Sequence, residues 1–547
     1  MMKQDLIQSI QQTIKDVFDV ETNVELTRPD EQFGDFATNI ALQLSKQLNK
    51  NPRDIAEAIV ERLQSNDGVV VQAEVAGPGF INLTLTDAAL LTLIEQQPAR
   101  TYDGQTVLVE YLDPNPFKEL HIGHAYSGTI GDSIGNLFTI AGGNVHRVTY
   151  QGDVGLHVAK ALYGMQQELD GASPDVIPEA ERAAFLGRAY AAGAAAYEAN
   201  EVAKAAIQAI NKKVYSREDE AQNQLYDAGK AWSLHYFAEA YEQLGLTPFE
   251  KNYMEGAVAS EGLELVKAHL ADGVFSQSDG AVVFLGEKHG LHTRVFINTQ
   301  GLPTYEAKDL GNAMQKWRDY NYDRSVIITA EEQSQYFKVM LKALEQFAPE
   351  QARATTHLAH GMVRLSSGKM SSRTGKVLRA LDVLQAVEQA TAEVSKDNVH
   401  PAALAALKYA FLKNRIGGDV AFDINESVSL EGNSGPYLQY AYARACSILA
   451  KASATEQNIV DLQTDERSLV RRLGEWAETV DKAVDDLMPH HICTYLYELA
   501  QTFNRFYEKN RVIDDPRQNV RLQLVARYTA TLKTGLELLG ITAPERM

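Results

Sequence analysis

The chain begins with apolar residues at the spacing of a helix that buries one face. This periodicity predicts helices over residues 2–18 and 35–49. A third helix is expected from Asn51-Pro52 to about residue 64, because asparagine caps a helix start and proline suits the first helical position. Three helices with little chain between them favour a compact first unit.

Alternating apolar positions replace this pattern at residues 69–75 and 80–85. Gly77-Pro78-Gly79 stands between the two runs, and glycine with proline favours a tight turn. The two runs are therefore predicted to be strands of a hairpin. Together with the helices they predict a small α/β domain over residues 1–100.

The next region alternates apolar strands with a long helix. A strand at residues 107–112, a helix from about 121 to 141 and a strand at 146–150 make one βαβ unit. Such units build a parallel sheet whose ligand lies beyond the carboxyl ends of the strands. Residues 101–400 are expected to form a Rossmann-like α/β domain with further strands near residues 282–285, 295–297 and 325–328.

Two regions of the chain are almost wholly helical. Residues 155–245 are rich in alanine and predict an inserted group of helices without recognisable chemistry. Residues 401–547 predict a separate helical bundle. The fold class is therefore α/β, with a parallel-sheet domain between a small N-terminal α/β domain and an all-helical C-terminal bundle.

The composition narrows the class of protein. The 547 residues are 45% hydrophobic and 23% charged, which excludes a disordered chain, and no apolar run is long enough to cross a membrane. Two cysteines are too few for a disulfide framework and favour a reducing compartment, with the cytoplasm as the expectation. The net charge of −20 argues against an overall basic surface for nucleic acid but leaves local patches open.

The loop after the first strand of the βαβ unit carries candidate chemistry. His121 and His124 are three residues apart at the start of the predicted helix, and Lys118 precedes them. Two imidazoles, a lysine and the N–H groups of a helix start favour an anion. Gly123 removes a side chain and lets a ligand approach the backbone. The alternative is a pair of surface histidines.

A second candidate lies far downstream. Residues 364–379 hold five basic residues and no acidic one, in a strongly acidic chain. A loop rich in glycine, serine and lysine can surround phosphate oxygens with hydrogen bonds. A solvated basic loop without a ligand is the alternative.

Together the two segments resemble the HIGH and KMSKS signatures of class I aminoacyl-tRNA synthetases. Residues 121–124 match the first signature letter for letter. The second departs from the pattern at Ser372, where many of these enzymes have a second lysine, and Arg373 follows it. The longer first loop, from Asp113 to His124, is similar to that of arginyl-tRNA synthetases. The resemblance to this family extends to residues 33–39, 77–82, 432–444 and 544–547.

This resemblance implies an arginine–tRNA ligase that forms arginyl-adenylate from L-arginine and ATP with Mg²⁺, and transfers the arginine to the terminal adenosine of tRNA-Arg. Members of the family generally need bound tRNA to activate arginine, and they usually work as monomers. The resemblance implies no protein-bound metal. It also implies a KMSKS-like loop at 366–376 and an anticodon-binding function for the C-terminal bundle.

The resemblance assigns residues to three groups. Catalysis and ATP binding fall to His121, His124, Lys118, Gly123, Lys369, Met370 and Ser371. Arginine binding falls to Glu110, Asn115, Tyr305, Asp309, Gln333 and, with a looser flanking match, Glu255. Contacts to tRNA fall to Phe80, Asn82, Tyr437, Tyr440 and Met547.

The residues themselves support part of this assignment. A guanidinium requires carboxylates in a planar arrangement, and Tyr305 and Asp309 are four apart on one predicted helical face. Tyr437, Tyr440 and Tyr442 could stack on bases, although their spacing fits a helix core equally well. A small nucleotidyltransferase and a catalytically silent tRNA-binding paralogue are the alternative functions.

Overall fold

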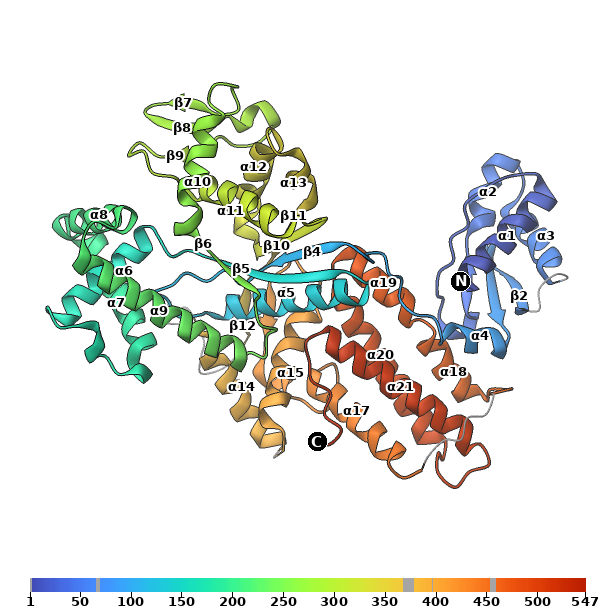
Figure 1. The fold of residues 1–547 in the computed structure, drawn as a ribbon. Coiled ribbons are helices and arrows are strands. Elements are labelled where there is room, and N and C mark those ends of the chain that lie inside the picture. Colours follow the sequence, from blue (N-terminus) through green and yellow to red (C-terminus); the bar gives the residue numbers. More distant parts are fainter. Residues whose placement is uncertain (1, 65–68, 367–377, 396, 453–458) are drawn as a thin grey trace.

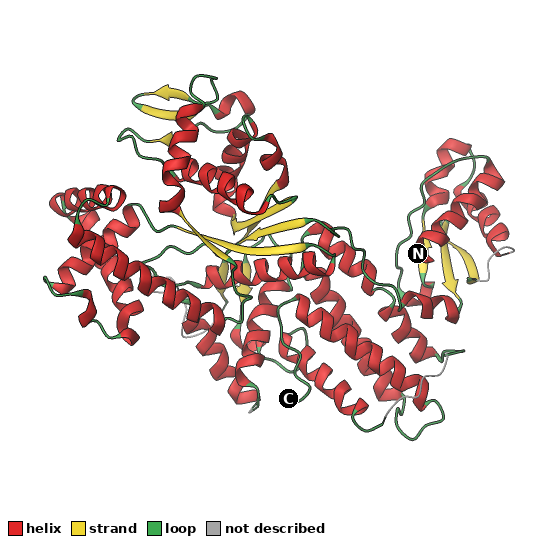
Figure 2. Cartoon of the chain, viewed as in Figure 1, coloured by secondary structure: helices red, strands yellow, loops and turns green. Residues whose placement is uncertain are grey.

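The computed structural model describes residues 2–64, 69–366, 378–395, 397–452 and 459–547. Figure 1 shows a central sheet with helices on both faces, a helical bundle below it and a small N-terminal domain to one side. Figure 2 shows that helices predominate in every part of the molecule outside its sheets. No helix among the described residues is long and apolar enough to span a membrane.

The N-terminal domain packs four helices around a three-stranded antiparallel sheet of order β1-β3-β2. Its elements are α1 (Met2–Phe18), β1 (Phe36–Thr38), α2 (Ile40–Leu48), α3 (Pro52–Gln64), β2 (Val70–Ala76), β3 (Phe80–Leu85) and α4 (Asp87–Leu93). The predicted hairpin is confirmed, and the Asn51 side chain accepts a bond from Arg53 N at 2.9 Å. The helix predicted over 35–49 is wrong in its first part, because the buried residues of β1 pair with β3 instead.

The catalytic-domain sheet has five parallel strands in the order β11-β10-β4-β5-β6. The strands are β4 (Thr106–Glu110), β5 (Asn144–Gln151), β6 (Lys251–Met254), β10 (Arg324–Ala330) and β11 (Thr355–His360). The predicted βαβ unit is confirmed as β4, α5 (Ile122–Ile140) and β5. The first strand ends at Glu110, two residues earlier than predicted.

Alternate residues of β4 enter two different cores. Val107 and Val109 pack with α5, whereas Leu108 packs with Val148 and Tyr322 on the other face. Figure 1 shows α5 beneath the sheet, with α10 (Glu255–Ala268) and α11 (Tyr305–Tyr320) above it. The same upper layer contains α12 (Ser334–Glu345) and α13 (Pro349–Ala354). Because side chains alternate along a strand, Glu110 belongs to the upper face with Leu108.

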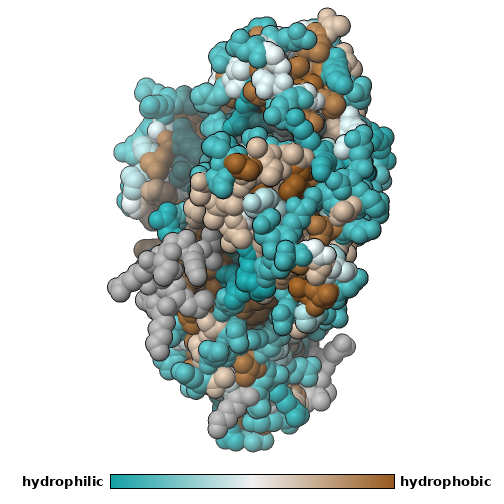
Figure 3. All heavy atoms as spheres, turned by 90° about the vertical axis from the view of Figure 1, so that its left-hand side faces the viewer, coloured by the Kyte–Doolittle hydropathy of each residue, from teal (hydrophilic) through white to brown (hydrophobic). Residues whose placement is uncertain are grey.

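Two insertions extend this domain. Between β5 and β6 lie α6 (Leu156–Leu169), α7 (Arg182–Ala199), α8 (Glu201–Ser216) and α9 (Glu220–Gln243). Between α10 and α11 lies an antiparallel sheet of β7 (Ser276–Ser278), β8 (Ala281–Phe284) and β9 (Arg294–Ile297). Figure 3 views the molecule from the side on which these helices lie, where the surface is mostly hydrophilic with scattered apolar side chains.

Within its described residues, the C-terminal part is helical apart from one short strand. Its elements are α14 (Ala380–Val394), α15 (Val399–Leu412), β13 (Val420–Phe422), α16 (Ile424–Ser427), α17 (Gly435–Leu449), α18 (Thr464–Leu473), α19 (Trp476–Asp486), α20 (His490–Lys509) and α21 (Gln518–Leu538). Strand β13 pairs with β12 (Val363–Leu365). The pairing joins the bundle to the start of the second basic segment.

Polar contacts fix the bundle to both other domains. Arg467 of α18 bonds Asp35 Oδ2 at 2.5 Å and Asp87 Oδ1 at 2.7 Å in the N-terminal domain. From α5, Ser133 Oγ donates to Leu538 O at 2.8 Å, and Asn136 Nδ2 donates to Glu537 O at 3.0 Å. The last carbonyls of α21, which lack partners within a helix, are therefore capped by the helix that begins at the histidines.

Candidate active site

The loop between β4 and α5 is held in an unusual backbone conformation. Leu112, Asp113 and Phe117 have φ values of 76°, 44° and 68°. Asp113 Oδ1 accepts a bond from Tyr150 N at 2.8 Å, and Phe117 N donates to Ser233 Oγ at 2.8 Å. A left-handed conformation costs a non-glycine residue of order 1 kcal/mol or more, so these anchors hold the loop against local strain.

His121 and His124 cap the start of α5. His121 lies just outside the helix, and its Nδ1 accepts a bond from Gly123 N at 3.1 Å. His124 Nδ1 accepts a bond from His121 N at 3.0 Å, and the two rings lie 3.8 Å apart. A Cβ on Gly123 would lie 2.9 Å from the His121 ring, so glycine is required here for the histidine itself. The expectation that these backbone N–H groups are free for an anion is wrong, because the imidazoles accept them.

Both imidazoles are kept neutral by their surroundings. Burial lowers the pKa of His121, and Lys118 lowers it further. Burial lowers the pKa of His124 well below its ordinary value, with His121 and Lys118 adding to the shift. Since both Nδ1 atoms accept backbone N–H groups, each neutral ring carries its proton on Nε2. The pair therefore presents two neutral N–H donors.

The helical insertion contributes to this region. Lys118 Nζ lies 4.4 Å from the centre of the Tyr190 ring on α7. Asp153, which follows β5, accepts bonds from Tyr226 at 2.9 Å and Lys230 at 2.6 Å, both on α9. The insertion is thus fixed to the carboxyl edge of the sheet beside the histidines.

The second basic segment lies mostly outside the described residues. This applies to Lys369, Met370, Ser371, Ser372 and Arg373. The chain that follows them is bonded to the first loop, since Ile122 N donates to Leu378 O and Ala380 N donates to Leu120 O, both at 2.9 Å. Arg379 also pairs with Glu119 at 3.1 Å. The two segments of the sequence are therefore adjacent at one end.

Two of the predicted arginine-binding carboxylates are paired with buried lysines. Glu110, at the end of β4, accepts bonds from Lys316 Nζ at 2.7 Å and from Asn312 Nδ2 at 3.2 Å. Glu110 and Lys316 are each only 2% exposed. Glu255, the first residue of α10, pairs with Lys308 of α11. A Cβ on Gly152 would lie 2.2 Å from Asn115 Oδ1 and 3.2 Å from Glu255 Oε1, so these two predicted residues meet beside Gly152.

Asp309 has no cationic partner among the described residues. It accepts a bond from the Tyr336 hydroxyl of α12. Burial raises the pKa of Asp309 to about 7, and Glu110 adds to the rise while the Tyr336 bond opposes it. A positively charged ligand beside Asp309 would therefore stabilise its ionised form.

Tyr305 and Gln333 lie nearer to solvent. Tyr305 is the first residue of α11, is 52% exposed, and lies with its ring 4.3 Å from Lys308 Nζ. Gln333 ends a short 3₁₀ turn, Glu331–Gln333, that follows β10, and it is exposed. Both stand beyond the carboxyl edge of the sheet, where the ligand of such a fold binds.

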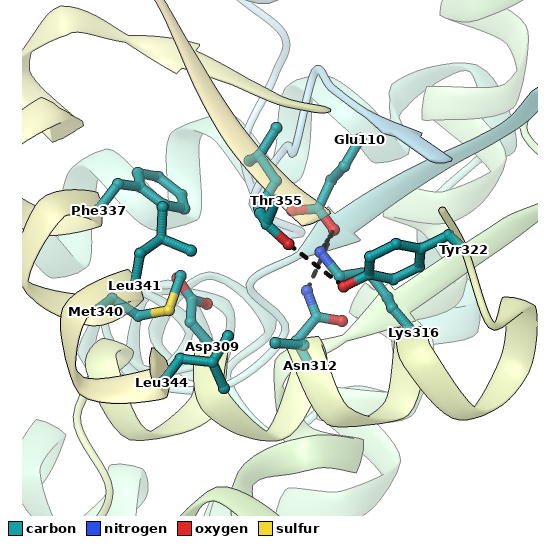
Figure 4. A pocket seen from close by; sticks show the side chains of 12 residues that line it. Glu110, Asp309, Asn312, Lys316, Tyr322, Phe337, Met340, Leu341, Leu344 and Thr355 are labelled. Carbon is teal, nitrogen blue, oxygen red and sulfur yellow. Dashed lines mark hydrogen bonds and ion pairs between the residues drawn. The ribbon is translucent and has the colours of Figure 1, made fainter. Parts of the chain in front are cut away.

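Figure 4 shows the pocket that reaches inward from Asp309. Glu110, Asn312 and Lys316 meet on its polar side, and Tyr322 contacts Thr355 beside them. The apolar wall consists of Phe337, Met340, Leu341 and Leu344. The pocket is thus polar around the carboxylates and closed by hydrocarbon behind them. Among the described residues, no group of three or more His, Cys, Asp or Glu side chains could hold a metal ion.

The predicted tRNA-contacting residues are spread over the two outer domains. Phe80 is 42% exposed at the start of β3, with Asn82 two residues along the same strand. On α17, Tyr440 is exposed, whereas Tyr437 accepts a bond from Asn504 at 2.9 Å. Tyr442 is buried, so base stacking is wrong for that tyrosine and core packing holds. The C-terminal segment ending at Met547 lies beside α15, where Asn398 bonds Arg546 O at 2.8 Å.

The sequence contains a helical spacing that could have predicted the polar side of the pocket. Tyr305, Asp309, Asn312 and Lys316 recur at intervals of four, three and four, which places them on one face of a helix. Tyr336 had no such signal, because α12 meets α11 only in the folded chain. The two lysine partners were also missed, since nothing in the sequence pairs Glu110 with a residue more than 200 positions away.

A parallel sheet whose first loop ends in paired histidines and is bonded to the second basic segment defines a class I aminoacyl-tRNA synthetase. The family described as tRNA synthetases class I (R), catalytic domain, matches residues 87–415, more than half of the chain. The arginyl tRNA synthetase N terminal domain matches residues 4–85, and the DALR anticodon binding domain matches residues 438–547. The chain belongs to the arginyl-tRNA synthetase family, whose members join arginine to tRNA.

Individual proteins agree with this assignment. The chain is 28% identical to an arginine–tRNA ligase of Porphyromonas gingivalis over 96% of both chains, and 29% identical to that of Bdellovibrio bacteriovorus over 95% of this chain and 93% of the other. The structure matches Thermus thermophilus arginyl-tRNA synthetase with a TM-score of 0.82, 26% identity and full coverage of both chains. The resemblance and the fold class predicted from the sequence are thus confirmed.

Proposed function

We propose that this arginine–tRNA ligase holds the arginine side chain beside Asp309 and the ATP phosphates beside His121 and His124. The arginine carboxylate attacks the α-phosphate in line and releases pyrophosphate. The resulting arginyl-adenylate then esterifies the terminal adenosine of tRNA-Arg and releases AMP. The observation that carries this proposal is the difference between the carboxylates of the pocket: Glu110 and Glu255 each have a lysine, whereas Asp309 has none among the described residues.

Charge balance explains why such a pocket suits arginine. Lys316 pairs with Glu110 and Lys308 pairs with Glu255, so Asp309 is left to pair with the guanidinium of the substrate. Asp309 supplies two acceptor oxygens for its N–H groups, and Tyr305 covers the outer side. In this proposal Asn115, Gln333 and Glu255 contact the polar end of the substrate. An amino acid without a positive side chain leaves Asp309 desolvated and unpaired, which is strongly rejected.

The phosphate end works by positioning and charge rather than by covalent chemistry. The two Nε2–H groups of His121 and His124 donate to phosphate oxygens, and Gly123 leaves room for the nucleotide. Lys118 supplies positive charge from the first loop, and Lys369 supplies it from the second, with Met370 and Ser371 beside it. Magnesium enters with ATP.

The outer domains bind the nucleic acid. We assign residues 1–100 to the outer corner of tRNA through Phe80 and Asn82, and residues 401–547 to the anticodon arm through Tyr440, Tyr437 and the end of the chain at Met547. Residues 101–400 carry the catalytic domain. The enzyme acts as a monomer in the cytoplasm, where tRNA is charged.

ATP–pyrophosphate exchange with each of the twenty amino acids, with and without tRNA, tests the proposal. We expect exchange with arginine alone, and only when tRNA is added. Exchange with another amino acid would show that Asp309 does not select the substrate. Absence of exchange under every condition would favour a silent tRNA-binding paralogue.

A further inference from the structure

Tyr150 lies among the three carboxylates of the pocket, although no sequence pattern singled it out. It is the second-last residue of β5, and its N–H donates to Asp113 Oδ1 at 2.8 Å. Two residues earlier on the same strand, Val148 stands opposite Glu110 of β4. On the other side, Tyr150 stands opposite Tyr253 of β6, two residues before Glu255. The strand register therefore places Tyr150 between Glu110 and Glu255 at the carboxyl edge.

The side chain of Tyr150 belongs to the face of the sheet that carries the pocket. It packs in the cluster that holds Leu108, Val148, Tyr253 and Tyr322, beneath α11. Glu110 follows Leu108 on this face by strand alternation, and Asp309 reaches it from α11. The tyrosine ring is thus directed toward the same space as the carboxylates.

The Tyr150 hydroxyl is buried and has no hydrogen-bond partner in the described part of the chain. A buried hydroxyl without a partner is costly, and this one faces the carboxylates of the pocket, so a donor bound there would satisfy it. Burial raises the pKa of Tyr150 well above its ordinary value, and Asp309 and Glu255 add to the rise, so the group stays protonated. Its oxygen keeps free acceptor positions in a space where the neighbouring groups are acceptors as well.

We propose that the Tyr150 hydroxyl is a further specificity residue of the arginine pocket, accepting a hydrogen bond from the substrate guanidinium that pairs with Asp309. This inference rests on the proposed placement of the arginine side chain. A guanidinium has five N–H donors in one plane, more than one carboxylate can accept. Tyr150 supplies an acceptor from the sheet, at an angle to the acceptors of α11. A lysine ammonium is a compact point charge, so it gains less from acceptors that lie in these two directions.

Tyr150→Phe removes the hydroxyl and leaves the ring. We expect KM for arginine to rise about ten- to a hundred-fold, the usual effect of losing a hydrogen bond to a charged group. The inhibition constant of agmatine, which has the guanidinium but no carboxylate, should rise by the same factor. KM for ATP should stay within twofold, and the melting temperature should not fall, because the substitution removes an unpaired buried group.

Tyr528→Phe is the matched control. Tyr528 lies in the C-terminal bundle and also has a buried hydroxyl without a partner in the described residues. We expect it to leave KM for arginine and the agmatine constant unchanged. If Tyr150→Phe behaves like Tyr528→Phe in both measurements, the inference is overturned, since the hydroxyl then binds water or nothing.

Asp309→Asn separates this inference from the proposal on which it rests. If Asp309→Asn strongly weakens agmatine while Tyr150→Phe does not, the pocket is correct and the role of Tyr150 is wrong. If Asp309→Asn leaves agmatine unaffected, the pocket itself is misplaced. Weakening by both variants supports both statements.

Discussion

The two halves of the candidate active site are built in opposite ways. The arginine half consists of buried side chains on β4, α10, α11 and α12, and two of its three carboxylates already have lysine partners. The phosphate half is built on the start of α5 and the loop before it, with His121 at the cap, and the second basic segment lies mostly outside the described residues. Two carboxylates of the arginine half are neutralised before a substrate arrives, whereas the phosphate half presents N–H donors at a helix start.

This difference assigns amino-acid selectivity to the arginine half and the phosphate chemistry to the other half. A guanidinium is distinguished from an ammonium by the directions of its hydrogen bonds, so its acceptors must sit on rigid elements. Phosphates change position and charge during the reaction, and donors at a helix start beside loops suit a moving anion. Substitutions in the first half should therefore change amino-acid recognition, and substitutions in the second should change turnover.

Asp309→Asn should have the largest effect. It removes the carboxylate that we pair with the substrate guanidinium, and losing one partner of a desolvated charge pair costs about 2–5 kcal/mol or more. We expect kcat/KM for arginine to fall about 10³-fold in tRNA aminoacylation, with KM for ATP nearly unchanged. Asp319→Asn is the control on the same helix, because Asp319 bonds Lys251 and Tyr253 away from the pocket. Equal losses in both variants would contradict the assignment.

Lys316→Met tests whether the pocket is fixed in advance. It leaves Glu110 buried without its cation, which costs about 3–5 kcal/mol of unfolding free energy. Urea unfolding followed by circular dichroism measures this loss. Lys251→Met is the comparison, since its pair with Asp319 is partly exposed and such pairs contribute about 0–1 kcal/mol. A loss below 1 kcal/mol at Lys316 would mean that the Glu110 pair does not stabilise the pocket.

His124→Ala tests the phosphate half. Losing one preorganised donor to a transition state typically lowers kcat about 10²- to 10³-fold. We expect that loss in ATP–pyrophosphate exchange, while KM for arginine changes less than threefold. His146→Ala is the control, because His146 is a partly exposed histidine paired with Glu250. Full turnover of His124→Ala would remove this histidine from the mechanism.

The pH dependence should give the smallest effect. Asp309 must be ionised to bind a guanidinium, and its pKa in the free protein is about 7. We expect kcat/KM for arginine to fall about tenfold per pH unit below 7. The histidines do not add to this slope, since the pKa of each is already lowered and both rings stay neutral.

Tyr336→Phe sharpens the pH experiment. The Tyr336 bond lowers the pKa of Asp309, so its loss should move the midpoint of the profile to higher pH. Stability should change with pH in the direction opposite to activity. Because folding raises the pKa of this carboxyl, the unfolding free energy should fall as pH rises from about 4 to 7. A profile flat between pH 6 and 8 would contradict the assigned role of Asp309.

Much of the fold could be read from the sequence because it depends on local pattern. The strand-helix-strand unit at β4, α5 and β5, the hairpin of β2 and β3 and the helical C-terminal part all follow from periodicity. The prediction was wrong at residues 35–38, because pairing with β3 outweighs helical spacing when all three strand residues are buried. It was also wrong about the free N–H groups at the start of α5, which two imidazoles occupy.

Sequence pattern alone was enough for the family, for the histidine loop at a strand end and for the helical face that carries Tyr305 and Asp309. Which carboxylates are already neutralised depends on the folded chain. Lys316 meets Glu110 across 206 positions, and the register of β5 and β6 brings Tyr150 between Glu110 and Glu255. The physical reason is that the charge available to a substrate depends on what each buried group already contacts, and those contacts join distant parts of the chain.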